Sequence, residues 1–304
     1  MIVIENLSKS FGEKIVLDKL SCQIKESTIY GIIGVNGAGK STLLRTINGI
    51  YMQDSGTILI DGENIVDNEN LKQSIAFVPD EFYFFYGYKL IDLAKFYQSL
   101  YKRFDMNRFN QIIQILGLNP KEKISTFSKG MKRQSALACA LSTRAKYMFF
   151  DETFDGLDPI KRNDIKAILK QIAHEDGTTI VLTSHNLKEV EDVCDDMGIL
   201  TKGNLSLQNE IQIQNATISK LQVAFYRPVG EQLIRAALSR ANINQVIECK
   251  VVARVATIIF KGNASQGIEA LKPLNPALID ELKLSLEETF VYEKEEFENV
   301  SNRK

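Results

Sequence analysis

The sequence predicts an α/β domain with a largely parallel sheet, followed by a small α+β unit. From residue 1 to about residue 206, short β-rich runs alternate with helical patterns, as in a sheet flanked by helices. Runs 147–150 and 180–182 are apolar without alternation, which is typical of strands buried on both faces. A glycine-rich segment at 34–41 joins a strand pattern to a helix pattern, as such folds require.

The composition is that of a globular protein. Its 304 residues suffice for one large domain or two, and 44% are hydrophobic and 25% charged. Lys and Arg number 37 against 38 Asp and Glu, so no positive excess exists to neutralise a nucleic acid, and we expect none as partner. No apolar run approaches the roughly 20 residues that span a bilayer, and the first residues do not resemble a signal peptide. We therefore expect a cytoplasmic protein.

The domain boundaries follow from changes in the pattern. Residues 1–210 form the first domain, and apolar residues at helical spacing predict a helical insertion at about 82–145. A strand, a turn and a strand at 198–205 close this domain. Residues 216–304 predict an accessory or dimerisation domain. Its expected elements are a strand at 220–227, a helix at 231–239, two strands within 246–260, a short helix at 267–271, and a last helix opened by a capping box at 285–288.

Residues 34–41 match the phosphate-loop pattern G-x-x-x-x-G-K-[ST]. Glycines let consecutive backbone amides point at phosphate oxygens, and the following helix adds the positive end of its dipole. We expect Lys40 to lie against the β- and γ-phosphates of a nucleotide and the Ser41 hydroxyl to bind Mg²⁺. The predicted nucleotide-binding residues of this segment are Gly34, Val35, Asn36, Gly37, Ala38, Gly39, Lys40, Ser41 and Thr42.

Two carboxylates and a histidine follow the two buried strand patterns. Asp151 and Glu152 follow the strand at 147–150, and ligands of open α/β sheets bind at such carboxyl ends. We expect Asp151 to hold Mg²⁺ and Glu152 to polarise the attacking water. His185 follows the next strand and can reach the γ-phosphate, although a purely structural role stays open.

In this order, these residues resemble the ATP-binding subunit of ABC transporters over most of residues 1–206. The resemblance implies a P-loop NTPase fold of the ABC type, ATP as substrate with Mg²⁺, and ATP hydrolysis. The family's signature, Leu-Ser-Gly-Gly-Gln, is similar to Phe-Ser-Lys-Gly-Met at 127–131, and Phe11 matches the aromatic that stacks on adenine. A core-packing role for Phe11 stays open.

The resemblance also implies a head-to-tail dimer, as a homodimer or a heterodimer. In such dimers the signature of one subunit closes over ATP held by the phosphate loop of the other. Here that signature would supply Ser128, Lys129 and Gly130. An ordinary helix-capping role for Ser128 is the alternative.

Three positions depart from the family's pattern. Asp80 stands where the family usually has Gln, and it either ligates Mg²⁺ or leaves the metal untouched. Lys129 replaces a glycine, and it either adds positive charge near the opposing γ-phosphate or points to solvent. Asp155 replaces a small residue in the loop by which the two subunits of such dimers touch. Activity is still expected, because the phosphate-loop lysine, both carboxylates and the histidine are present.

The resemblance extends to short subunits of bacterial export systems that act with a separate membrane permease. Six aromatics stand in the seven positions 82–88, where the family's helical insertion meets the permease; burial inside the insertion is the alternative. We therefore expect a peripheral subunit on the inner face of the membrane that powers export of an antibiotic or amphipathic peptide. The alternative is a soluble, nucleotide-gated ABC protein with a regulatory role.

Overall fold

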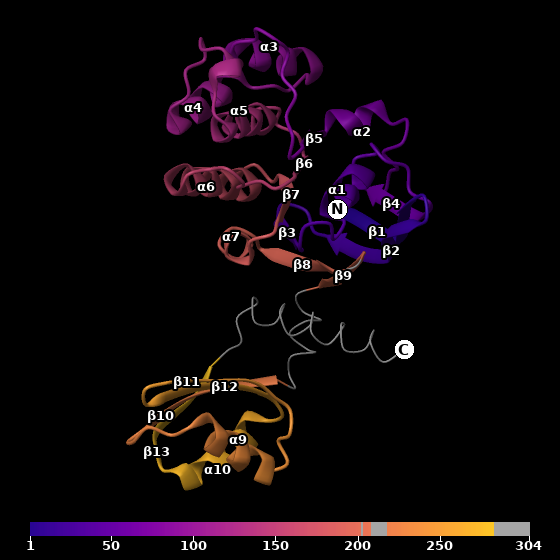
Figure 1. The fold of residues 1–304 in the computed structure, drawn as a ribbon. Helices are drawn as coiled ribbons and strands as arrows, with labels where there is room; N and C mark the ends of the chain where they lie inside the picture. Colours follow the sequence, from indigo (N-terminus) through magenta and orange to yellow (C-terminus); the bar gives the residue numbers. More distant parts are fainter. Residues whose placement is uncertain (202, 208–217, 283–304) are drawn as a thin grey trace. The chain divides into compact units, whose positions relative to one another are not determined.

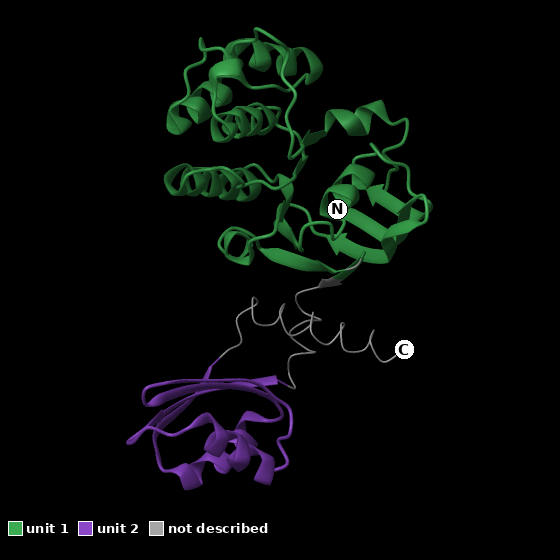
Figure 2. Cartoon of the chain, in the orientation of Figure 1, with its two compact units in different colours: residues 1–208 green, residues 209–304 purple. Residues whose placement is uncertain are grey.

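The computed structural model describes residues 1–201, 203–207 and 218–282 of the chain. The chain divides into two compact units, residues 1–208 and residues 209–304 (Figure 2). Within the described ranges, no helix is both long and apolar enough to cross a membrane. The helix predicted from 285 onwards lies outside the described residues.

The main sheet of the first unit confirms the predicted α/β class. Its six strands lie in the order β5 (Ile75–Val78), β6 (Tyr147–Phe150), β7 (Thr179–Ser184), β3 (Ile29–Ile33), β8 (Asp196–Thr201) and β9 (Asn204–Leu207). The first five are parallel, and β9 pairs antiparallel with β8. Every residue of β3, β6 and β7 is buried, which explains the apolar runs at 147–150 and 180–182.

A second, antiparallel sheet packs with the first helix. Its strand order is β2 (Lys14–Ile24), β1 (Ile2–Phe11) and β4 (Ser55–Ile60). Helix α1 (Lys40–Ile47) lies next to this sheet (Figure 1). Its residues Leu43, Leu44 and Ile47 belong to one hydrophobic core with residues of both sheets. The apolar stripe expected for this helix thereby anchors the phosphate loop that precedes it.

Helices form the predicted insertion. They are α3 (Leu90–Leu100), α4 (Met106–Leu116) and α5 (Lys129–Leu141), with a short α2 (Glu69–Gln73) before β5 (Figure 1). The helix α4 begins after Asp105, whose carboxylate accepts two first-turn amides, and ends at Gly117 in a left-handed conformation. Helix α5 is buried from Arg133 to Leu141 and contacts α3, α4 and β5. Helices α6 (Pro159–Glu175) and α7 (Leu187–Glu191) pack against β3 and β7.

The second unit is a four-stranded antiparallel sheet with two helices. Its strand order is β11 (Val246–Val252), β12 (Val255–Lys261), β10 (Ile218–Phe225) and β13 (Pro276–Leu282). Helices α9 (Glu231–Arg240) and α10 (Ala264–Leu271) share one hydrophobic core with the sheet, so the chain order β-α-β-β-α-β is ferredoxin-like. The edge strand β13 was not predicted, because most of its residues are exposed and its apolar alternation is weak.

Candidate active site

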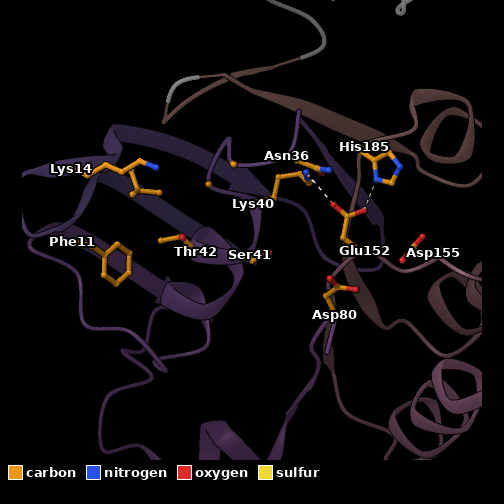
Figure 3. A pocket seen from close by; sticks show the side chains of 13 residues that line it. Phe11, Lys14, Asn36, Lys40, Ser41, Thr42, Asp80, Glu152, Asp155 and His185 are labelled. Carbon is orange, nitrogen blue, oxygen red and sulfur yellow. Dashed lines mark hydrogen bonds and ion pairs between the residues drawn. The ribbon is translucent and has the colours of Figure 1, made fainter. Parts of the chain in front are cut away.

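The predicted site residues emerge from the carboxyl ends of four neighbouring parallel strands. Strand β5 leads to Asp80, β6 to Asp151 and Glu152, β7 to His185, and β3 to the phosphate loop at 34–41. Because these ends meet at one edge of the sheet, residues far apart in the sequence come together. A cavity of about 670 Å³ opens there (Figure 3). Described residues that line it are Phe11, Lys14, Val16, Asn36, Gly37, Gly39, Lys40, Ser41, Thr42, Asp80, Glu152, Asp155 and His185.

The phosphate loop leaves the first amides of α1 without a side-chain cap. Gly39, the residue before the helix, has φ 110°, a left-handed conformation that glycine adopts without steric cost. It has no side-chain oxygen to accept hydrogen bonds from these amides, which therefore remain available to an anion at the positive end of the helix.

Two residues that line the cavity, Lys14 and Val16, were not predicted from the sequence. Both lie near the start of β2, and nothing in the sequence pattern of this strand shows which of its ends borders the cavity.

Glu152 lies between Lys40 and His185. Its Oε1 is 3.1 Å from the Lys40 ammonium, and its Oε2 is 3.0 Å from Nδ1 of His185 (Figure 3). The Lys40 ammonium also donates to the carbonyl oxygens of Gly34, at 2.7 Å, and Val35, at 3.3 Å. Lys40 and Glu152 are nearly buried, whereas His185 is half-exposed. An ion pair and a hydrogen bond therefore join the three groups in one row that runs from the phosphate loop to the end of β7.

Asp151 has one carboxylate oxygen that the described chain leaves unpaired. Its Oδ1 accepts the Thr183 hydroxyl at 2.7 Å, whereas its buried Oδ2 has no hydrogen-bond partner among the described residues. A buried carboxylate oxygen without a partner is costly, and it suits a cation or a cation-bound water. In the described ranges no group of three or more His, Cys, Asp or Glu side chains could hold a metal ion. Mg²⁺ fits such a sparse site, because it retains waters and takes ligands from substrate phosphates.

Asp80 forms an ion pair with Arg133, a residue that sequence reasoning missed. Nη2 of Arg133 lies 2.5 Å from Oδ1 of Asp80, and the Arg133 side chain is buried on α5. In the sequence, nothing distinguishes Arg133 from any other polar residue in the first turns of a helix. Its partners come from the ends of two strands, and no local pattern shows that juxtaposition.

The signature segment at 127–131 is fixed to the loop at 155–158. Lys129 Nζ lies 2.6 Å from Asp155 Oδ2, and this hydrogen bond lowers the pKa of the Asp155 carboxyl below its ordinary value. A side chain at Gly130 would come within 2.5 Å of the Gly156 carbonyl oxygen, so the two segments touch by their backbones. Two of the three departures from the family pattern, Lys129 and Asp155, thus pair with each other.

Ser128 caps α5 in this structure. Its hydroxyl accepts the Met131 amide at 3.2 Å, as the capping alternative predicted. The hydroxyl proton can still be donated elsewhere. Ser128, Lys129 and Gly130 do not line the cavity around Lys40, so the structure does not bring them to the phosphate loop within one chain.

The aromatic residues singled out in the sequence are largely accessible. The Phe11 ring borders the cavity, is 46% exposed, and meets the Tyr51 ring edge-on at 5.3 Å. In the segment 82–88, Tyr83, Phe85 and Tyr86 are exposed. The other three aromatics of this described segment, Phe82, Phe84 and Tyr88, are partly buried, so the segment offers both exposed and partly buried rings.

Comparison with known proteins decides the family. The ABC transporter ATP-binding protein YtrB of Bacillus subtilis (strain 168) is 31% identical over 96% of this chain and 97% of its own length. The chain belongs to the ABC transporter ATP-binding proteins. The family model described as ABC transporter matches residues 17–155, which include the phosphate loop, the signature segment and Glu152. The predicted resemblance is confirmed, and the chain is an ABC ATPase that binds and hydrolyses ATP.

Other ABC ATPases match over most of the chain. The linearmycin resistance ATP-binding protein LnrL of Bacillus subtilis (strain 168) is 32% identical over 81% of each chain. The methionine import ATP-binding protein MetN of Desulfitobacterium hafniense (strain Y51) is 27% identical over 96% of this chain and 92% of its own. A solved dimeric ATP-binding cassette, MJ0796 in a post-hydrolysis state with ADP and Pi, superposes with a TM-score of 0.62 at 23% identity. The match covers 68% of this chain and 97% of the cassette, and the superposition confirms the fold.

Proposed function

We propose that this ABC ATPase works as a head-to-tail dimer, with Glu152 as the general base of ATP hydrolysis, and that it powers export by a separate membrane permease. The observation that carries the proposal is the row Lys40–Glu152–His185 at the rim of the phosphate-loop cavity. A lysine for phosphate charge, a carboxylate base and a histidine that orients it are the groups that ATP hydrolysis needs. Measurement of phosphate release from ATP by the purified protein, with and without Glu152, tests the proposal.

In the proposed complex, the triphosphate lies on the loop at 34–42. The amides around Gly37 and Gly39 and the first turn of α1 donate to phosphate oxygens. The Lys40 ammonium pairs with the β- and γ-phosphates, and the Phe11 ring stacks on adenine, since an exposed ring at the rim can offer its face. Glu152 is then free of Lys40, and its carboxylate accepts a proton from the attacking water while His185 holds it in place.

Ser41 and Asp151 are the residues that we expect to hold Mg²⁺. Mg²⁺ bound there would neutralise negative charge on the phosphates during transfer. The unpaired, buried Oδ2 of Asp151 supports the assignment of this residue, and Ser41 is supported by its place in the lining of the phosphate-loop cavity. The third predicted ligand, Asp80, presents an oxygen that is already paired with Arg133, so only its Oδ2 would serve a metal.

The proposed dimer explains why the signature segment is remote from Lys40 in one chain. A sister subunit would place its Ser128, Lys129 and Gly130 over the γ-phosphate, where the N-terminus of α5 contributes amides. The Asp155 loop, bound to Lys129, would form part of the same contact. The dimeric assembly of the superposed cassette with ADP and Pi supports this arrangement.

The export direction rests on the altered signature, the Pro79-Asp80-Glu81 segment and the likeness to LnrL, whose name denotes resistance to linearmycin. An antibiotic or amphipathic peptide is the proposed cargo, and the permease would hold this subunit at the inner face of the membrane. The likeness to MetN, an import protein, makes import the competing direction. The departures at Asp80 and Lys129 favour, as a second candidate, a soluble nucleotide-gated ABC protein with a regulatory role instead of a transport role. Co-purification of the permease from membranes, together with ATP turnover, distinguishes the two candidates.

Replacement of Phe11 tests the proposed adenine contact. Phe11→Ala is expected to raise the Kd for ATP about tenfold or more, because base–aromatic stacking contributes ~1–3 kcal/mol. Phe11→Tyr retains the ring face and is expected to bind ATP as the wild type does. Titration with a fluorescent ATP analogue measures both, and equal affinity of all three proteins would remove Phe11 from the adenine site.

Replacement of the exposed aromatics tests the permease contact. Tyr83→Ala with Tyr86→Ala is expected to reduce recovery of the permease in a membrane pull-down about tenfold, since exposed aromatics are favoured interface anchors. Tyr226→Ala, which removes an exposed ring from the second unit, is the control and should not change recovery. Undiminished recovery with the double variant would place the permease contact elsewhere.

A further inference from the structure

We propose that Arg133 is a positioning residue for ATP hydrolysis. Its guanidinium joins the backbone of Glu152 to Asp80, which shortly precedes the aromatic segment 82–88. The inference rests on the proposed role of Glu152 as general base. It adds a residue that acts through Glu152, and it gives Asp80 a role other than metal binding.

Arg133 is a buried cation whose guanidinium contacts the ends of two strands. Its side chain is 1% exposed. Nη1 donates to the carbonyl oxygens of Asp151, at 3.2 Å, and Glu152. Nη2 donates to the carbonyl oxygen of Asp80, at 3.0 Å, and to its Oδ1, at 2.5 Å. A planar fork of donors is suited to hold several acceptors at fixed angles, which a lysine ammonium is not.

The contact with Glu152 acts on a backbone that needs support. Glu152 has φ 46°, in the left-handed region that residues other than glycine rarely adopt. Three hydrogen bonds hold it there: its amide donates to the Thr183 hydroxyl at 2.8 Å, and its carbonyl oxygen accepts from Arg133 and from the Asp155 amide, the latter at 3.2 Å. This conformation directs the Glu152 carboxylate toward Lys40 and His185 (Figure 3). Loss of the Arg133 contact would therefore misdirect the carboxylate without touching the nucleotide.

The contact with Asp80 supplies the charge that a buried guanidinium requires. A buried cation without a counter-charge is strongly unfavourable, and the Asp80 carboxylate is the ion-pair partner of Arg133 among the described residues. A glutamine at position 80 would not provide this charge. The departure from the family pattern at Asp80 is thereby explained by Arg133.

Arg133 also touches the start of the aromatic segment. Its guanidinium carbon lies 5.2 Å from the centre of the Phe82 ring, within cation–π range. Phe82 stacks on Phe84, and Tyr83 between them is 92% exposed. Displacement of residues 80–82 by a bound permease would move the acceptors of Arg133, and through it the carbonyl of Glu152. Arg133 thus provides a physical link between the proposed docking segment and the proposed base.

A double-mutant cycle on Asp80 and Arg133 tests the proposal. Asp80→Asn and Arg133→Lys are each expected to lower kcat for ATP hydrolysis about tenfold while changing the Kd for ATP less than about twofold. Because both changes break one linkage, the double variant should lose no more activity than the more impaired single variant. Half-saturation by Mg²⁺ should be the same in all four proteins.

Two results would overturn the proposal. One is a double variant whose fold-loss in kcat equals the product of the losses in the two single variants, which would mean that Asp80 and Arg133 act separately. The other is a shift of several-fold in the Mg²⁺ requirement of Asp80→Asn, which would make Asp80 a metal ligand instead. If Arg133→Lys does not fold, Asp80→Asn still decides, because a kcat like that of the wild type contradicts the proposal.

Arg144→Lys is the matched control. Arg144 also binds an aspartate, Asp105, through its Nε and Nη2, but on the surface and away from the cavity. Its kcat should equal that of the wild type. The role of Glu152 is tested separately, by the loss of ATP turnover when Glu152 itself is replaced. If that loss is observed but the effects of Asp80→Asn and Arg133→Lys multiply in the double variant, only the role of Arg133 is rejected.

Discussion

Glu152→Gln is expected to lower kcat for ATP hydrolysis by about 10²–10⁴-fold while ATP still binds. The amide is nearly isosteric with the carboxylate and can still accept from Lys40, but it cannot take a proton from water. With cleavage stopped, the ATP-bound head-to-tail dimer should accumulate. Phosphate release measures the first effect, and light scattering with and without Mg·ATP measures the second.

Glu175→Gln is the control for this substitution. Glu175 lies exposed at the end of α6, where it accepts from Gln171, so neither turnover nor assembly should change. Turnover of Glu152→Gln at the wild-type rate would remove Glu152 from the role of base. A monomer that binds ATP but never dimerises would instead contradict the proposed assembly.

Lys40→Ala is expected to raise the Kd for ATP about 100-fold or more and to abolish turnover. The substitution removes a nearly buried ammonium whose charge-assisted hydrogen bonds to phosphate contribute about 1.5–3 kcal/mol each. Isothermal titration calorimetry with Mg·ATP measures the loss of affinity. A melting curve like that of the wild type would show that the effect is on binding and not on folding.

The matched control is Lys170→Ala on the exposed face of α6, which should bind ATP with unchanged affinity. Wild-type affinity in Lys40→Ala would contradict the assignment of residues 34–42 as the phosphate site.

The central strands of the main sheet were predictable because burial on both faces leaves an apolar run in the sequence. Strand β6 is apolar throughout and β7 is apolar from Ile180 to Leu182, and the loop at 34–41 has a spacing that few other structures share. The order of the strands in the sheet could not be predicted from these patterns, since it depends on long-range pairing. That order is what places Asp80 beside Asp151.

The ion pairs of the site could not be predicted from local patterns in the sequence. Lys129 and Asp155 each looked like an isolated departure from the family signature, and only the fold shows that they bind each other. Arg133 was missed for the same reason, because its acceptors are backbone carbonyls and one carboxylate from other elements. The roles assigned to Phe11, Ser128, Asp151 and His185 stay predictions that the proposed experiments address.

The second unit was predicted as a β-α-β unit without its last strand. Helix α9 and strands β11 and β12 have clear periodic patterns, whereas β13 is an edge strand whose exposed positions mix Ala277 and Leu278 with Asp280 and Glu281. The ferredoxin-like order therefore became evident only with the strand pairings. The accessory or dimerisation role expected for this unit stays a prediction.

A crystal structure of the Glu152→Gln protein grown with Mg·ATP tests the central claim most directly. The account predicts a triphosphate on the amides at 36–42 of one protomer, with Ser128 of its partner within hydrogen-bond distance of the γ-phosphate. A triphosphate bound away from Lys40, or bound with solvent where the partner's signature segment should lie, would contradict it.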